Sequence, residues 1–232
     1  MVVKAILMDF NGVIINDEPI QHAAYREILK EDGIDVSDED YYSRLGMDDK
    51  TFVASILEAA GKVADPEKVR TITRGKTEKW RAIVETSLPL FPGVDDFVKR
   101  MSTNGLSLGI VSMAKREEID FVLELAGIAP CFSVVVSAED VSKCKPDPEC
   151  YRIGFAKIDA HRTSLGHAPL IHSDCLVIED SPPGVEAARA NGLPVLGVAN
   201  TVEPDALRTA GAGSVTTMLG EWMPESVRRV FA

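Results

Sequence analysis

Three carboxylates of this chain stand where apolar runs end. The run that begins at Val2 leads directly into Asp9, and the stretch "CLVIED" ends in Glu179 and Asp180. Apolar runs of this length predict buried strands. An acid at the end of a buried strand costs free energy unless a cation or hydrogen-bond donors compensate it, so these positions suggest chemistry.

A hydroxyl and an ammonium group occupy similar places in the sequence. Ser112 ends the run "LSLGIVS", and Lys145 follows the run "FSVVVS" after a short loop. Taken singly, Ser112 fits a helix cap and Lys145 fits a solvated loop. Together with the three carboxylates they form a set that coincidence does not explain well.

The elements that must position these residues alternate along the chain. Buried strands are predicted at the start of the chain and at residues 106–112, 132–137, 175–180 and 194–198. Helical patterns lie between them, and one is predicted to begin with Ser181 as its cap. Alternating buried strands and helices predict an α/β fold with a doubly wound parallel sheet. In such a sheet the carboxyl ends of the strands meet at one edge, where ligands bind.

The residues expected at this edge suit phosphoryl transfer. Asp9 and Asp180 can hold Mg²⁺, which favours one or two carboxylates together with water and substrate phosphate. Ser112 and Lys145 can hold phosphate oxygens, and backbone N–H groups are expected to help them. The turns that would supply these N–H groups contain Asn11, Gly12, Met113 and Ala114. Asp9 is then the candidate nucleophile for an aspartyl-phosphate.

Composition limits the partners and the number of domains. The chain has 232 residues, of which 45% are apolar, enough for one large domain or a domain with an insert. Its formal charge of −11 argues against binding to nucleic acid or to an anionic membrane. Four cysteines without a C-x-x-C pair, no signal-like start and no long apolar run predict a reduced, soluble, cytoplasmic protein.

A helical block interrupts the strand and helix units. Residues 17–87 show helical spacing of apolar residues, and "SLPLFPGV" then breaks the pattern with two prolines and a glycine, as a linker would. We therefore predict a core domain of residues 1–16 and 88–232 and a helical domain of residues 17–87.

Four motifs of the chain resemble those of the haloacid dehalogenase superfamily, and within it the β-phosphoglucomutase-like phosphatases and mutases. They are "DFNGVI" from Asp9, Ser112 after "LGIV", "KPDPE" from Lys145, and "VIEDSPPGVEAARANG" around Asp180. The resemblance spans nearly the whole chain. It implies a Rossmann-like core and a helical cap inserted after the first motif.

The resemblance also implies a role for each motif residue. Asp9 would be the nucleophile, and Mg²⁺ would lie on Asp9, Asp180 and the backbone carbonyl of Asn11, with Glu179 in support. Ser112 and Lys145 would hold the phosphate. Lys76 matches a basic residue of the family's cap, and Lys50 lies beside the cap loop, so both are candidates for substrate binding.

Two departures from the family pattern bear on activity. The family usually carries at position 11 an aspartate that protonates the leaving alcohol and later deprotonates water, whereas this chain has Asn11. General acid–base catalysis typically contributes ~10²–10⁴ in rate, so its loss would impair turnover. The mutase also uses a cap arginine to hold a sugar phosphate, and Asp49 stands there.

The sequence therefore leaves more than one function open. We favour a Mg²⁺-dependent phosphatase of small phosphomonoesters, such as a sugar phosphate. The alternatives are a phosphohexomutase similar to β-phosphoglucomutase, and a catalytically impaired protein that binds a phosphorylated ligand.

Overall fold

A computed structural model describes residues 3–231, so Met1, Val2 and Ala232, which the predicted core domain includes, lie outside the described residues. The fold is built on a parallel sheet with the strand order β3-β2-β1-β4-β5-β6. The strands are β1 (Ala5–Met8), β2 (Ser107–Val111), β3 (Phe132–Val136), β4 (Cys175–Glu179), β5 (Val195–Val198) and β6 (Ser214–Thr216). The predicted α/β class is confirmed.

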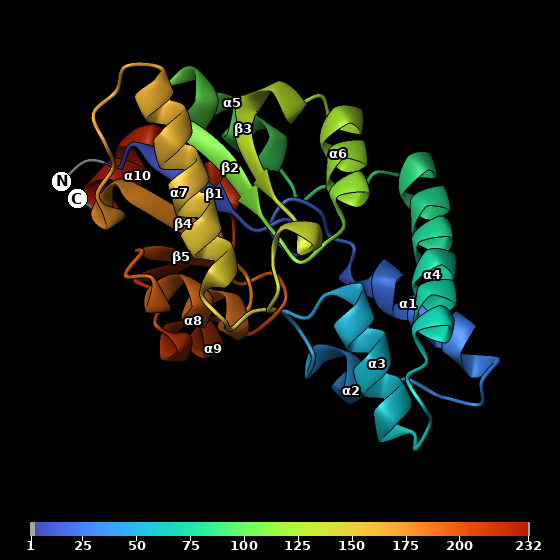
Figure 1. The fold of residues 1–232 in the computed structure, drawn as a ribbon. Coiled ribbons are helices and arrows are strands. Elements are labelled where there is room, and N and C mark those ends of the chain that lie inside the picture. Colours follow the sequence, from blue (N-terminus) through green and yellow to red (C-terminus); the bar gives the residue numbers. More distant parts are fainter. Residues whose placement is uncertain (1–2, 232) are drawn as a thin grey trace.

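Helices cover both faces of this sheet (Figure 1). They are α5 (Val94–Thr103), α6 (Arg116–Leu125), α7 (Glu149–Ser164), α8 (Pro182–Ala190), α9 (Pro204–Ala210) and α10 (Pro224–Val230). Short 3-10 turns join some of these elements: η1 (Ala129–Cys131), η2 (Ala138–Asp140), η3 (His172–Asp174) and η4 (Leu219–Glu221). None of the helices in residues 3–231 is long and apolar enough to span a membrane.

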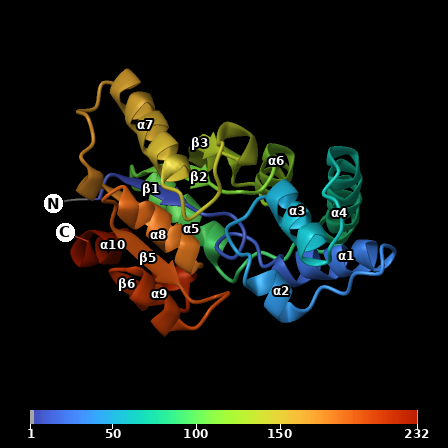
Figure 2. The ribbon, with the colours of Figure 1, turned by 60° about the horizontal axis from the view of Figure 1, so that its bottom comes forward.

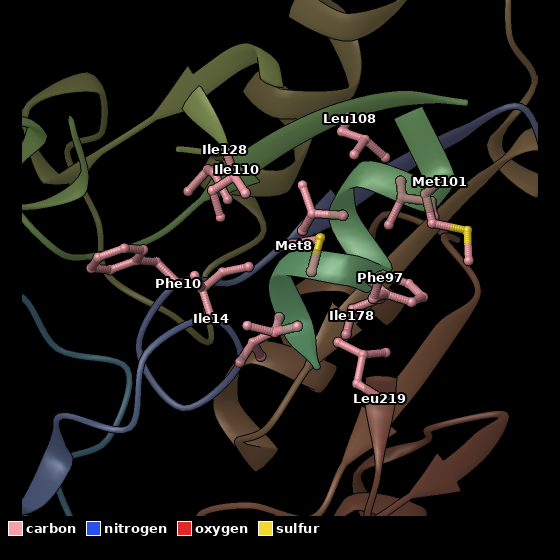
Figure 3. Close-up of a cluster of buried hydrophobic side chains, with 14 of the residues drawn as sticks. Met8, Phe10, Ile14, Phe97, Met101, Leu108, Ile110, Ile128, Ile178 and Leu219 are labelled. Atoms are coloured by element: carbon pink, nitrogen blue, oxygen red, sulfur yellow. The ribbon is translucent and has the colours of Figure 1, made fainter. Parts of the chain in front are cut away.

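Alternate residues of each strand pack on opposite faces of the sheet. On one face Met8 of β1 and Ile178 of β4 pack with Phe97 and Met101 of α5, as Figure 3 shows. On the other face Leu7 packs with residues of α7, α8 and α9. Strands buried on both faces are apolar throughout, which explains why they are recognisable in the sequence as uninterrupted apolar runs.

A second group of helices lies beside the sheet rather than over its faces (Figures 1 and 2). It comprises α1 (Glu18–Lys30), α2 (Asp38–Tyr42), α3 (Asp49–Ala59) and α4 (Pro66–Thr86). These helices share a buried cluster of their own, which includes Tyr25, Leu29, Phe52 and Ile72. The exact limits of the predicted domain of residues 17–87 stay a prediction.

The chain enters and leaves this helical group through two adjacent segments. Asn16 N donates to Pro89 O at 2.7 Å, and Phe91 N donates to Ile14 O at 3.2 Å. The expected linker "SLPLFPGV" is therefore paired with the segment that follows β1. Because the two connecting segments are hydrogen-bonded to each other, they fix the position of the helical group relative to the sheet edge.

The contact between α7 and the sheet requires a residue without a side chain. A Cβ on Gly154 would lie 2.6 Å from Val111 Cγ2 and 3.3 Å from Leu7 Cδ1. Gly154→Ala is therefore expected to overpack this interface and to lower the free energy of unfolding by about 1–3 kcal/mol. Urea unfolding measures the change.

Gly75→Ala provides the matched control, because Gly75 also lies inside a helix but its Cβ would meet the flexible end of Ile28 at 3.3 Å. Its effect is expected to stay within about 1 kcal/mol, since alanine also favours the helix. Equal losses for the two variants would contradict the proposed overpacking.

Candidate active site

The carboxyl ends of β1, β2 and β4 bring the sequence-predicted polar residues to one cleft. From the core the cleft is lined by residues that include Asp9, Asn11, Ser112, Met113, Lys145 and Asp180. From the helical group it is lined by residues that include Glu18, Gln21, Tyr25, Tyr41, Asp49 and Phe52. Segments far apart in the sequence thus supply one site, as the parallel topology requires.

Lys145 lies at the centre of this arrangement. Its Nζ is 3.0 Å from Asp9 Oδ2 and 2.6 Å from Glu179 Oε1, and all three side chains are buried. Burial disfavours the ammonium charge, but Asp9 and Glu179 outweigh it and raise the pKa of Lys145 above its usual value. Lys145 is therefore a fixed positive charge beside the candidate nucleophile.

Glu179 holds its position through a complete set of donors. Tyr151 OH donates to Oε1 at 2.8 Å, and Oε2 accepts from the backbone N–H groups of Asp180 and Ser181 at 3.1 and 3.2 Å. The Ser181 hydroxyl also donates to Oε2, at 3.1 Å, and makes no capping bond to α8. Ser181 is the N-cap residue of α8, as predicted, but its hydroxyl donates to the buried Glu179 carboxylate and does not cap a backbone N–H of the helix.

Asp180 is a buried acid of the site without a basic partner among the described residues. The Thr201 hydroxyl donates to Asp180 Oδ2, and no lysine or arginine of the described chain forms an ion pair with Asp180. Burial, together with Glu179 and Asp9, raises its pKa well above the usual range. One carboxylate oxygen each from Asp9, Glu179 and Asp180 lie within 4.8 Å of one another. This all-oxygen cluster fits a hard divalent cation, which would compensate the acid that Lys145 leaves unpaired.

Asp9 itself is buried but lines the cleft, with 8% of the residue exposed. Phe10 N donates to its Oδ1 at 2.8 Å, which fixes the carboxylate beside Lys145. Burial raises the pKa of Asp9 to about 7, and Lys145 opposes this shift. A cation in the acidic cluster would favour the carboxylate form that a nucleophile needs.

Asn11 is fixed by a second carboxylate that the sequence analysis missed. Its Nδ2 is 3.0 Å from both carboxylate oxygens of Asp17, and its Oδ1 accepts from Ser112 Oγ at 3.4 Å. Asp17 is fully buried and also accepts from Trp80 Nε1 at 2.7 Å and from Gln21 Nε2 at 3.0 Å. The acid that the family pattern expects at position 11 is absent, and a carboxylate lies directly behind the amide instead.

The comparison with known proteins identifies the family. Residues 3–192 match haloacid dehalogenase-like hydrolases. The chain belongs to this family. CbbY of Rhodobacter capsulatus is 28% identical over 203 residues, which cover 84% of this chain and 85% of CbbY. The pyrophosphatase PpaX of Oceanobacillus iheyensis is 27% identical over 161 residues, 69% of this chain and 72% of PpaX.

Two further similar proteins extend the comparison. The chloroplastic protein SUPPRESSOR OF QUENCHING 1 of Arabidopsis thaliana is 30% identical over 224 residues, but these cover 94% of this chain and only 20% of that protein. Among solved structures, β-phosphoglucomutase from Clostridium difficile superposes with a TM-score of 0.84 at 20% identity, covering 99% of this chain and 97% of that one. The resemblance inferred from the motifs is thus confirmed, as is the fold.

Three residues predicted to bind phosphate in this haloacid dehalogenase-like chain do not line the cleft. Gly12 N donates to Ile15 O at 3.0 Å, so the turn itself uses this donor. Lys50 is exposed on α3, and Lys76 is fully buried in ion pairs on α4. Their roles in substrate binding stay predictions that the cleft geometry does not favour.

The backbone at Gly12 has a different use. Its φ of +73° suits glycine, and a Cβ there would lie 1.8 Å from Asp180 Oδ2. Glycine at this position therefore lets the first motif approach the acidic cluster. This role could have been suspected from the sequence only as a turn residue.

Glu18 is a further cleft residue that the sequence analysis did not select. Tyr41 OH donates to its Oε2 at 2.5 Å. Burial, with the neighbouring Asp17 charge, raises the pKa of Glu18 from 4.5 to about 7. It is therefore a cleft carboxyl that can exchange a proton near neutral pH.

We expect Glu18→Gln to flatten the pH dependence of stability. The pKa of Glu18 is raised on folding, so protonated Glu18 stabilises the folded chain. This contribution to the free energy of unfolding is fully present below about pH 4.5 and is lost as the pH rises through about 7. Between about pH 5 and pH 8 the parent chain should lose more unfolding free energy than Glu18→Gln, as measured by urea unfolding. Glu58→Gln, on the exposed side of α3, should follow the parent, and a Glu18→Gln curve parallel to the parent would refute the shift.

Proposed function

We propose that this chain is a Mg²⁺-dependent phosphatase of small phosphomonoesters that works through an aspartyl-phosphate on Asp9. The observation that carries the proposal is the convergence of Asp9, Lys145, Ser112 and the acidic cluster at the wall of one cleft. Phosphatases among the similar proteins support it, including a phosphorylated carbohydrates phosphatase of Thermotoga maritima that is 23% identical over 211 residues.

The residues of the chain divide the proposed reaction between them. An Asp9 carboxylate oxygen attacks the phosphorus and forms the aspartyl-phosphate as the bond to the ester oxygen breaks. The alkoxide leaves and takes a proton from water, and Lys145 and Ser112 hold the non-bridging oxygens. Glu179 keeps the Lys145 ammonium in place. Asp9, Asp180 and the carbonyl of Asn11, with Glu179 in support, would hold Mg²⁺, which would supply positive charge beside the phosphoryl group.

Asn11 sets the limit of this chemistry. An amide can hydrogen-bond to the leaving oxygen but cannot give it a proton, and it cannot deprotonate the water that attacks phosphorylated Asp9. This observation favours a second candidate, a slowly reacting binder of a phosphorylated ligand. Asp49 in place of the mutase arginine gives the phosphohexomutase less support.

The proposed setting follows from the same observations. The proposed partner is a small phosphorylated metabolite, because Asp9, Ser112 and Lys145 line the same cleft. The four cysteines, Cys131, Cys144, Cys150 and Cys175, are all unpaired thiols. Free thiols are typical of a reducing compartment, so a cytoplasmic location stays our prediction.

Mg²⁺ is expected to stabilise the folded chain, and this stabilisation should require Asp180. Adding Mg²⁺ should raise the thermal midpoint of the parent, since a ligand that binds the native state stabilises it. Asp180→Asn should abolish the rise. Asp174→Asn is the matched control, because Asp174 is a buried acid at the opposite end of β4, paired with Lys4 at 2.8 Å. A Mg²⁺ response that survives in Asp180→Asn would remove the proposed metal site.

The test of function exchanges the amide of Asn11 with the carboxylate of Asp17. A single Asn11→Asp change would place a second carboxylate against Asp17, and the two would repel each other. The double variant Asn11→Asp with Asp17→Asn keeps the net charge and the contact. It should raise hydrolysis of sugar phosphates by ~100-fold or more, since general acid–base catalysis is restored.

Activated phosphates give the complementary measurement, because an aryl leaving group departs without much protonation. We expect p-nitrophenyl phosphate to react once with the parent and to leave a mass increase of one phosphoryl group, which Asp9→Asn removes. Asp174→Asn, which also removes a buried acid but at the opposite end of β4, should keep the mass increase. Rapid turnover of sugar phosphates by the parent, unchanged in the double variant, would show that another group, such as Glu18, supplies the proton.

A further inference from the structure

The helical group contributes an ion-pair cluster to the wall of the cleft. Lys76 is 0% exposed, and its Nζ lies 2.8 Å from Asp49 Oδ2 and 3.1 Å from Glu118 Oε1. Lys115 Nζ lies 3.3 Å from the same oxygen of Asp49 and donates to Thr77 Oγ1 at 2.6 Å. Both lysines are thus held by the protein's own carboxylates and hydroxyls.

The acids of this cluster face the cleft while the lysines stand behind them. Asp49 and Glu118 line the cleft together with Glu18, whereas Lys76 and Lys115 are not among its lining residues. Burial disfavours the Asp49 charge, but Lys76 and Lys115 outweigh it and lower the pKa of Asp49. A substrate group entering this half of the cleft therefore meets a permanent carboxylate.

The cation that does line this half of the cleft is already engaged. Arg44 Nη1 donates to Asp40 O at 2.7 Å and lies 3.7 Å from Asp40 Oδ1, and Arg44 Nε donates to Ser55 Oγ at 2.9 Å. A second phosphate on the substrate would have to displace these partners, or lie against the Asp49 carboxylate, whose charge Lys76 and Lys115 already balance. A second anion would then meet a carboxylate and no unpaired cation, which disfavours its binding.

Aromatic side chains also line this half of the cleft. The ring centroids of Tyr25 and Phe52 are 4.5 Å apart, and those of Tyr41 and Phe52 are 5.5 Å apart. Tyr25 OH donates to Asp49 at 2.6 Å. Aromatic faces beside carboxylate acceptors suit a compact carbon skeleton that carries hydrogen-bond donors.

We propose that the substrate carries a single phosphate on an alcohol whose far end offers hydroxyl or ammonium donors and no second anion. This inference rests on the proposed function, and it defines the substrate class for the same cleft. The specificity arises from repulsion of a second anion as much as from attraction of donors.

Binding of matched sugar phosphates in the presence of Mg²⁺, measured by calorimetry, tests the inference. The probes are glucose 6-phosphate, glucosamine 6-phosphate and glucose 1,6-bisphosphate. The two monophosphates should bind at least ~10-fold more tightly than the bisphosphate. A bisphosphate that binds as tightly as glucose 6-phosphate overturns the inference and leaves the proposed function standing. If neither monophosphate nor inorganic phosphate binds, the proposed function fails with it.

Asp49→Asn tests the cause. It removes the carboxylate that holds Lys76, so the affinity for glucose 1,6-bisphosphate should rise at least ~10-fold while that for inorganic phosphate stays unchanged. Asp65→Asn, which removes an acid that caps α4 away from the cleft, should change neither affinity. Glu118→Gln releases Lys76 from its other partner and serves if Asp49→Asn does not fold. Bisphosphate affinity equal to that of the parent in the folded variant overturns the inference.

Discussion

The buried ion pairs of Lys145 hold the candidate site together. A lysine ammonium removed from water is stable only with close counter-charges, and Asp9 and Glu179 supply them at 3.0 and 2.6 Å. The three residues come from the end of β1, the loop after β3 and the end of β4. Their attraction therefore fixes the relative positions of three segments at the sheet edge, where packing of the apolar strands ends.

This arrangement leaves one acid in excess. Glu179 accepts from Lys145 and from the hydroxyl and N–H donors around it, so this group leaves no positive charge for Asp180. Asp180 keeps the Thr201 hydroxyl, which is a weak substitute for a positive charge. The structural role of Glu179 and the metal-binding potential of Asp180 are thus two consequences of one charge balance.

The sequence was sufficient for the features that depend on local pattern and topology. The apolar runs predicted β1 to β5, and parallel topology placed Asp9, Ser112 and Asp180 at one edge. The short strand β6 was missed, because its residues "SVT" are half-buried and form no apolar run.

Other features depend on packing between segments distant in sequence, and no pattern announces these. Lys76 was expected to face the substrate, but the packing of α4 against α3 and α6 buries it between two acids. Asp17 was missed for the same reason. It follows an exposed asparagine in the sequence, yet it is buried because Trp80, far along the chain, donates to it.

The same physical rule that assembles the site also limits what the cleft can accept. A fully buried lysine in the helical group requires fixed acids around it, and Asp49 and Glu118 meet this need from the cleft wall. The charge available to a ligand is then what remains after the protein has satisfied its own buried groups. On the core side Asp180 is left without a cation, and on the helical side Asp49 faces the cleft as a carboxylate. Substrate selectivity in this chain is in that sense a consequence of how its buried charges are paired.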